Sequence, residues 1–309
     1  EVYFLDNYPE DGSAQYVAQA YSNVKVITFG KNLGYYGALS QVIPETRGRY
    51  IIILPLDTVV HKDFVSELVR VAEMNPRIAV CMANTVNPDG SDYIVKERVK
   101  MPRLMYVPET SIFGNPVINP RPFERQPIRL LLSSGVSFLI RKDFHQTDEL
   151  FDLFYSHYTT DVDLSLRANV LGYETVFVPT AVVYHIDDNK ARLSANLLQR
   201  YFIGSRDRLL AFYKSMDTLE YILALPFLLM GIPHKVLVMR SSVPVMLRWA
   251  LVAMAFFFSP VVFVAALREI PRFYEKRNRV LSARRVGPFW VLKKLLPSHF
   301  PAWFRNPGS

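Results

Sequence analysis

The sequence has one cysteine, Cys81, in 309 residues, so no disulfide can form within the chain and a reducing compartment is expected. Charged residues make up 21% of the chain, slightly below the roughly 25% typical of soluble domains, while hydrophobic residues make up 50%. This composition excludes global disorder. The chain opens with Glu1 and an apolar run without a basic segment before it, so we expect no signal peptide and expect that an earlier element precedes it.

Acidic residues are scarce only in the last third of the chain. Residues 1–215 hold 23 Lys and Arg against 24 Asp and Glu, whereas residues 216–309 hold 13 against 4. The whole net charge of +8 therefore comes from the segment that also contains the longest apolar runs. Basic residues beside apolar segments favour a membrane surface as partner over nucleic acid.

Strand and helix patterns alternate through the first 80 residues. Apolar runs at 2–5, 24–29 and 50–56 predict strands, and amphipathic segments beginning near Ser13 and Asp63 predict helices. We expect an α/β fold with a Rossmann-like, open and mostly parallel sheet. Asp6 and Asp57 follow two of these strands, at the edge where such sheets bind ligands, although a lone Asp at this position also serves as a helix cap.

The middle of the chain predicts further strands and one helix. Residues 84–130 have little periodicity and suggest an extended surface excursion. A helix is expected from the acidic pair Asp161 and Asp163 to Leu171, with Gly172 at its C′ position. Residues 175–178 and 181–184 suggest strands interrupted by Pro179 and ending at His185.

Two apolar segments distinguish the last third, residues 221–233 and 249–267. The second approaches the roughly 20 residues that cross a bilayer, and the basic residues after it are expected on the cytoplasmic side. The segments form either a hairpin of two spans or re-entrant or interfacial helices. Pro226, Pro233 and Pro260 favour broken or shallow helices, and the remaining alternative is a buried helix of a soluble protein. We therefore divide the chain into a domain at 1–215 and a membrane-associated region at 216–309.

Five motifs in order resemble the family 2 glycosyltransferases, in particular their rhamnosyltransferase-like branch. They are Leu5-Asp6-Asn7 with Asp11-Gly12-Ser13, Asn32-Leu33-Gly34-Tyr35, the run from Ile51 to Thr58, the run from Phe151 to Leu164, and Gly172-Tyr173 with the run from Val178 to His185. The resemblance covers residues 1 to about 215. It implies the GT-A fold, a nucleotide-sugar donor, and an acceptor glycan that is polyprenyl-linked or part of a cell envelope.

The resemblance also implies site residues. Asp6, Asn7, Asn32, Gly34 and Asp57 would bind the nucleotide, and Asp57 with His185 would hold Mn²⁺ or Mg²⁺. Asp161 would be the catalytic base that deprotonates the acceptor hydroxyl, with its pKa raised by partial burial.

The acceptor side is predicted from less specific signals. It would include Ser134, Gly135 and Asp163. Asp163 also lies four residues before Arg167, the spacing of a helix ion pair, and two residues from Asp161, which turns the two carboxylates to different sides of a helix. One base opposite the leaving group predicts transfer with inversion at the anomeric carbon.

Some positions depart from the family's pattern. Pro55 stands where relatives have a metal-binding Asn or Asp, Thr160 stands where they have Glu, Ser40 and Val42 replace an Asn and a Gly, and the family's first strand is absent from the sequence. These departures leave an alternative open, a catalytically silent relative that binds nucleotide or glycan. A third hypothesis is a basic scaffold that binds membranes only.

Overall fold

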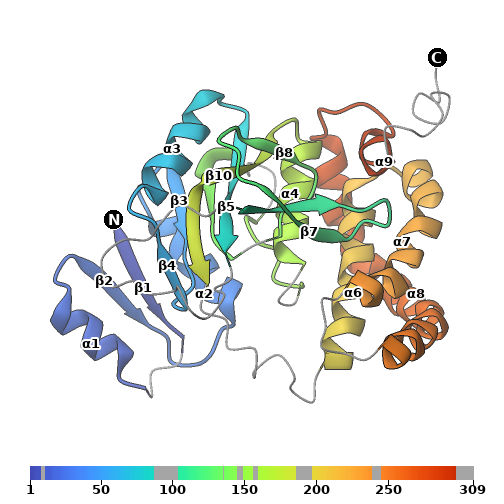
Figure 1. Cartoon of the computed structure of the whole chain (residues 1–309), viewed down its shortest axis with the longest axis horizontal. Helices are drawn as coiled ribbons and strands as arrows, with labels where there is room; N and C mark the ends of the chain where they lie inside the picture. The colour runs from blue at the N-terminus through green and yellow to red at the C-terminus, as the bar shows by residue number, and fades with distance from the viewer. Residues whose placement is uncertain are drawn as a thin grey trace.

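The computed structural model describes residues 1–7, 11–86, 104–134, 136–144, 149–155, 159–185, 197–238 and 245–296 (Figure 1). A small β-sheet with one helix lies at the N-terminal end, a larger sheet occupies the centre, and a group of helices forms the C-terminal side. The candidate site is built from the first two parts and from helix α4, which lies between the central sheet and the C-terminal helices.

The N-terminal elements follow the predicted alternation. They are β1 (Val2–Asp6), α1 (Ser13–Ala20), β2 (Val24–Thr28), α2 (Tyr35–Val42), a 3₁₀ turn (Ile43–Glu45) and β3 (Tyr50–Ile53). β1 and β2 are parallel, with Val2 opposite Val24 and Asp6 opposite Thr28. Gly34, which precedes α2, has a φ of 73°, a conformation that side chains other than glycine rarely adopt. The loop that leads into α2 therefore needs glycine at this position.

The central sheet is mixed, so the prediction of a mostly parallel sheet is wrong. Its strand order is β3-β9-β5-β10-β4, with β8 (Ile128–Leu130) also paired to β10. Only β5 (Ile78–Val86) and β10 (Glu174–His185) pair in parallel, because β9 (Phe138–Arg141) enters between β3 and β5 and runs antiparallel to both. An apolar run marks a strand buried on both faces and carries no information about direction, so the sequence could not distinguish the two arrangements.

β10 is a single strand rather than two. Its pairing with β5 shifts register between Val178 and Val182, around Pro179. Proline has no N–H to donate to the ladder, so the strand bulges there and then continues. The side-chain amide of Asn84 donates to the carbonyl oxygen of Pro179 at 3.3 Å. The last residues of β10 then pair with β4 (Thr58–Val60) in the antiparallel sense.

The segment 84–130, predicted to be an extended surface excursion, contains regular strands in its described part. β6 (Leu104–Thr110) and β7 (Pro116–Pro122) form an antiparallel hairpin, and residues 87–103 lie outside the described residues. The hairpin tip packs on the C-terminal helices. A Cβ on Gly114 would come within 3.0 Å of the side chains of Leu228 and Phe212, and the amide of Asn115 donates to the carbonyl oxygen of Gly231 at 2.7 Å.

Helix α4 (Thr160–Val170) is buried along its whole length and has two packing faces. Leu164 and Ala168 pack with residues of the central sheet, whereas the face that carries Val162 and Leu166 packs with the C-terminal helices. Gly172 follows the helix with a φ of 83°, as expected for a C′ glycine. α3 (Phe64–Met74) covers another part of the sheet through Phe64, Leu68 and Val71. α4 is therefore a central element whose polar residues must find partners inside the protein.

The C-terminal helices are α6 (Leu197–Ser215), α7 (Thr218–Val238), α8 (Val245–Ser282) and α9 (Trp290–Leu295). The prediction that prolines break them is wrong, because α7 runs through Pro226 and Pro233 and α8 runs through Pro260 and Pro271. Side chains from outside α7 donate to its carbonyl groups near Pro233, including Tyr201 to Ile232 and Arg208 to Leu228.

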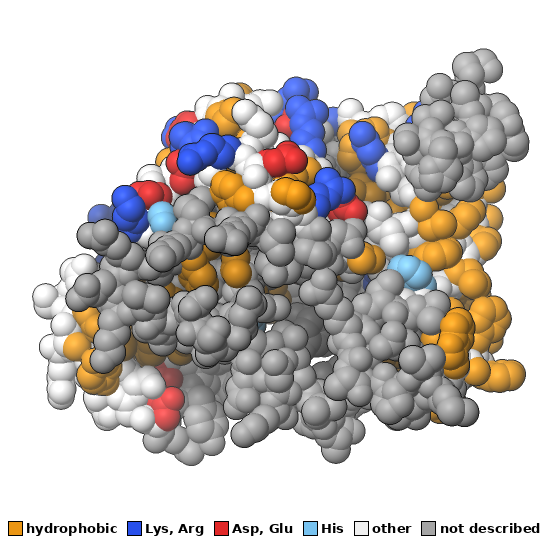
Figure 2. All heavy atoms as spheres, in the orientation of Figure 1, with side chains coloured by type: hydrophobic (Ala, Val, Ile, Leu, Met, Phe, Trp, Pro, Cys, Tyr) orange, Lys and Arg blue, Asp and Glu red, His pale blue; other side chains and the backbone are white. Residues whose placement is uncertain are grey.

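The outer faces of α7 and α8 are strongly apolar. α8 contains one stretch, Leu251–Ser282, that is long and apolar enough to cross a membrane, and only 17% of its most apolar window is buried. Hydrophobic side chains cover this side of the molecule (Figure 2). Those on α8 with substantial exposure include Trp249, Met254, Phe256, Phe257, Phe258, Val261 and Val264.

One hydrophobic core spans the boundary that we drew at residue 215. It joins α4 residues such as Leu166 to Phe212 of α6, Leu228 of α7 and Phe273 of α8. The division into regions 1–215 and 216–309 stays a prediction, and the helices on both sides of that boundary pack together.

Candidate active site

Strand register brings Asp57 and His185 together from 128 residues apart in the sequence. Asp57 immediately precedes β4, and β4 pairs with the end of β10 so that Thr58 lies opposite His185. The Nε2 atom of His185 is 3.0 Å from Oδ2 of Asp57. The sequence proposed this pair from a family resemblance only, and the sheet supplies the geometry.

The 3.0 Å between the two atoms is the distance of a hydrogen bond between His185 and Asp57. The pair also supplies an imidazole nitrogen and a carboxylate oxygen, two donor types that Mn²⁺ can take. Half of the Asp57 side-chain surface is exposed (52%), so other ligands have access. Within the described ranges no group of three His, Cys, Asp or Glu side chains is placed to hold a metal. The remaining ligands would therefore come from water and a diphosphate.

Hydrogen bonds join two loops that carry predicted nucleotide-binding residues, the loop after β1 and the loop before α2. The side-chain amide of Asn7 donates to Oδ1 of Asn32 at 3.0 Å, and the backbone N–H of Leu33 donates to Oδ1 of Asn7 at 2.8 Å. Gly34 N–H also donates to Oδ1 of Asn32. Asp6 is buried at the end of β1, directly before Asn7. These bonds place Asn7, Asn32 and Gly34 side by side, as the predicted site requires.

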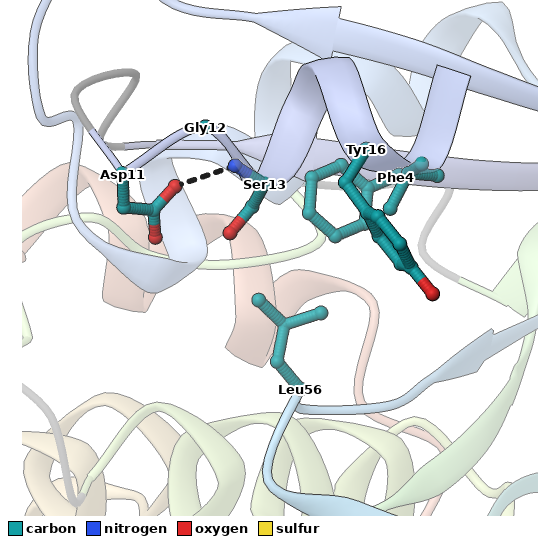
Figure 3. A pocket seen from close by; sticks show the side chains of 7 residues that line it. Phe4, Asp11, Gly12, Ser13, Tyr16 and Leu56 are labelled. Carbon is teal, nitrogen blue, oxygen red and sulfur yellow. Dashed lines mark hydrogen bonds between the residues drawn. The ribbon is translucent and has the colours of Figure 1, made fainter. Parts of the chain in front are cut away.

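A hollow of about 380 Å³ opens beside these loops (Figure 3). Phe4, Tyr16 and the turn at Asp11–Ser13 form one side of it, and Leu56 faces them from the other. Oδ1 of Asp11 accepts a hydrogen bond from Ser13 N–H at 2.9 Å, which holds the turn in place. Leu56, which lines the hollow, is the residue before Asp57 in the chain.

Two tyrosines that we did not predict as site residues join the donor side to helix α4. The rings of Tyr35 and Tyr36, in the first turn of α2, lie 5.1 Å apart. Desolvation of the phenol and the charge of Asp57 raise the pKa of Tyr35, although 41% of this residue is exposed. Burial and the charge of Asp161 raise the pKa of Tyr36. The charges of Asp57 and Asp161 thus act on consecutive tyrosines. The two tyrosines directly follow Gly34, a predicted nucleotide-binding residue, and this position was the sequence feature that could have predicted their place near the site.

Asp161 is in the first turn of α4 and is nearly buried, with 9% of its surface exposed. Its backbone carbonyl accepts hydrogen bonds from the hydroxyl groups of Ser133 and Ser165, at 2.6 and 2.9 Å. Ser133 N–H in turn donates to the Ser165 hydroxyl. These bonds hold the backbone of Asp161 next to Ser133, and the acceptor-side role of the neighbouring Ser134 stays a prediction. Gly135 lies outside the described residues.

Asp163 does not fit the acceptor side predicted for it. Its side chain has no exposed surface, and it forms ion pairs with Arg167 at 2.8 Å and with Lys214 of α6 at 2.6 Å. The pair with Arg167 is the i, i+4 contact that the spacing predicted. An acceptor has no access to a carboxylate enclosed in this way, so we leave Asp163 out of the proposed acceptor site.

Comparisons with known proteins support the resemblance. Residues 1–147 match the model of the "Glycosyl transferase family 2" family. The match covers just under half of the 309-residue chain. The match ends before α4, so it includes Asp57 and the loops around Asn7 and Asn32 but not Asp161 or His185.

Curated relatives extend the comparison beyond residue 147. The chain is similar to the "N-acetylglucosaminyl-diphospho-decaprenol L-rhamnosyltransferase" of two Mycobacterium tuberculosis strains, with 29% identity over 205 residues. The alignment covers 60% of this chain and 66% of those proteins, so it spans slightly less than two thirds of the relatives' length.

Solved structures show that the fold of this chain is GT-A-like. A crystal structure of GalNAc-T7 with UDP, GalNAc and Mn²⁺ superimposes with a TM-score of 0.57 at 16% identity, covering 97% of this chain and 52% of that one. Staphylococcus aureus TarS superimposes with a TM-score of 0.51 at 12% identity, covering 96% of this chain and 49% of that one. At these identities the likeness shows the fold and not the substrate.

Replacing either member of the Asp57–His185 pair is expected to weaken metal-dependent nucleotide binding. We expect Asp57→Ala and His185→Ala each to lower affinity for a nucleoside diphosphate in Mn²⁺ by at least about tenfold, with no effect in EDTA. Their effects should not add in the double variant, because both act on one ion. Calorimetric titration measures this, with the exposed Asp143→Ala as control. Equal losses with and without Mn²⁺ contradict a metal role for the pair.

Proposed function

We propose that this chain is an inverting, nucleotide-sugar-dependent glycosyltransferase that uses a divalent cation. The observation that carries the proposal is the contact between Asp57 and His185, which the pairing of β4 with β10 brings together. The second element is Asp161, which is buried in the first turn of α4. The family match at residues 1–147 supports the same reading.

The arrangement suggests a division of tasks in the reaction. Asn7, Asn32 and Gly34 would hold the nucleotide, and Asp57 and His185 would hold Mn²⁺ or Mg²⁺. The cation neutralises negative charge on the diphosphate that leaves. The carboxylate of Asp161 would accept the proton of the acceptor hydroxyl as that oxygen bonds to the anomeric carbon. Attack from the face opposite the leaving group inverts the anomeric configuration.

The proposed acceptor is a sugar linked to a polyprenol, or a cell-envelope glycan. The curated relatives support a lipid-linked acceptor, because their name specifies a diphospho-decaprenol substrate. The apolar outer face of α8 supports a membrane location. Arg268 and Arg272 follow this apolar part, and basic residues at such a boundary favour anionic headgroups and the cytoplasmic face.

Nucleotide titration followed by transfer tests the proposal. We expect one of UDP, dTDP and GDP to bind in the presence of Mn²⁺, and the sugar carried by that nucleotide to be transferred to a polyprenyl diphosphate-linked sugar with inversion. Calorimetry measures the first step, and NMR of the product's anomeric proton measures the second. Binding of none of the three nucleotides supports the silent relative instead, and a product with retained configuration excludes Asp161 as the base of a single displacement.

A further inference from the structure

A network of buried ion pairs includes Asp163 of α4, two residues after the proposed catalytic base Asp161. It consists of Asp152, Asp163, Arg167, Lys214 and Lys276, which come from residues 149–155, α4, α6 and α8. The side chains of Lys214 and Asp163 have no exposed surface, and that of Asp152 is 4% exposed. Charges so deeply buried persist only when each has close partners of opposite charge.

The contacts form a continuous chain from α8 to α4. Lys276 of α8 lies 2.6 Å from one oxygen of Asp152, and Lys214 of α6 lies 3.0 Å from the other. Lys214 also lies 2.6 Å from Asp163 of α4. Burial acts to raise the pKa of Asp152, but Lys214 and Lys276 outweigh it and lower that pKa to about 2. Asp152 is therefore ionised at neutral pH and binds both lysines.

Arg167 extends the network to the segment that precedes α4. It pairs with Asp163 and donates to the carbonyl groups of Glu149 and Leu150, at 3.2 and 2.6 Å. The next residue, Phe151, packs its ring 4.8 Å from Tyr36, the tyrosine beside Asp161. The network thus fixes both the helix that carries Asp161 and the segment that supports Tyr36.

We propose that Lys276 is a positioning residue for the transfer reaction, through which α8 holds Asp161 in place. Lys276 itself does not contact the proposed substrates. It supplies the second positive charge that Asp152 needs, so that Lys214 remains shared with Asp163. Without Lys276, Lys214 is the one lysine left between two carboxylates and is drawn toward Asp152, which loosens its hold on α4. This inference rests on the proposed function, because it assigns Asp161 the role of base.

The position of Lys276 on α8 also connects the ion-pair network to the apolar surface of that helix. The residue lies on α8, the same helix whose earlier part presents the exposed apolar surface. Eight residues lie between it and Leu267, the end of the uncharged run. The network therefore links the helix proposed to contact the membrane with the helix that carries the base.

Steady-state kinetics of Lys276→Met in the full chain test the proposal. We expect kcat to fall about tenfold, because a small displacement of a base from its productive position has effects of this size or larger. The KM for the donor should stay unchanged, because Asn7 follows β1, Asn32 precedes α2 and Asp57 precedes β4, whereas the ion pairs of the network join residues of α4, α6, α8 and segment 149–155. Lys276→Arg retains the charge and should restore most of the activity. Lys294→Met, on the exposed side of α9, is the matched control.

Hydrogen–deuterium exchange of residues 159–170 supplies a readout that does not depend on activity. Faster exchange of this helix in Lys276→Met than in Lys294→Met supports the proposal. Unchanged exchange and kcat in Lys276→Met overturn it, as does an equal loss of kcat in Lys276→Arg. If the unmodified chain transfers no sugar, the proposed function fails, and the exchange data still decide whether Lys276 holds α4.

Discussion

Asp161→Asn is expected to lower kcat by about 10² to 10⁴, the range that a positioned general base contributes. Asparagine has nearly the same shape as aspartate, so the hydrogen bonds from Ser133 and Ser165 to the backbone carbonyl should persist. The amide cannot accept the proton of the acceptor hydroxyl. The measurement is the rate of sugar transfer at saturating donor and acceptor.

Two controls separate loss of the base from loss of the fold. Affinity for the nucleoside diphosphate in Mn²⁺ should be unchanged in Asp161→Asn, because the donor side is built from β1, α2, β4 and β10. The melting temperature should also be close to that of the unmodified protein. A variant that binds nucleotide normally and transfers sugar at the original rate excludes Asp161 as the base.

Lys214→Met is expected to lower the free energy of unfolding by about 3 to 5 kcal/mol, the usual cost of removing one partner from a buried ion pair. The replacement removes a cation from Asp152 and Asp163 together, and both carboxylates stay inside the protein. A loss of this size lowers the melting temperature by roughly 10 °C in a chain of this length. Thermal unfolding followed by circular dichroism measures the change.

Most of the loss of stability in Lys214→Met should come from the missing positive charge rather than from lost packing. Methionine fills a volume similar to that of lysine, so the apolar contacts beside Tyr155 and Phe273 are largely retained. Adding Asp152→Asn to Lys214→Met removes a carboxylate that has lost one of its two cations and should recover part of the stability. Lys62→Met, at an exposed site, should change it little. A Lys214→Met variant as stable as Lys62→Met contradicts the ion-pair network.

Strand β10 differs from the two strands that the sequence predicted. Both flanking apolar runs and the proline between them are visible in the sequence, and they predicted two strands. The structure joins them through a bulge, and this continuity carries His185 to its place opposite Thr58. Pairing between strands far apart in the chain depends on which edges remain available, and local periodicity contains no such information.

The charged residues of α4 show the same limit. Asp161 and Asp163 are two residues apart, and the sequence correctly predicted the contact of Asp163 with Arg167. It gave no indication of Lys214 or Lys276, because those lysines reach α4 and its neighbouring segment only after α6 and α8 have packed. Asp163 therefore looked available to an acceptor although it is fully enclosed.

What the sequence by itself determined is local. The hydrophobic periodicity located most helices and strands, Gly172 marked the end of α4, and the ordered motifs identified the family 2 domain. The tertiary structure alone decided the mixed direction of the sheet, the meeting of Asp57 with His185, and the burial of Asp163. The reason is physical, since propensity and capping act between residues a few positions apart, whereas strand register and burial of charge depend on contacts that exist only once distant segments have packed.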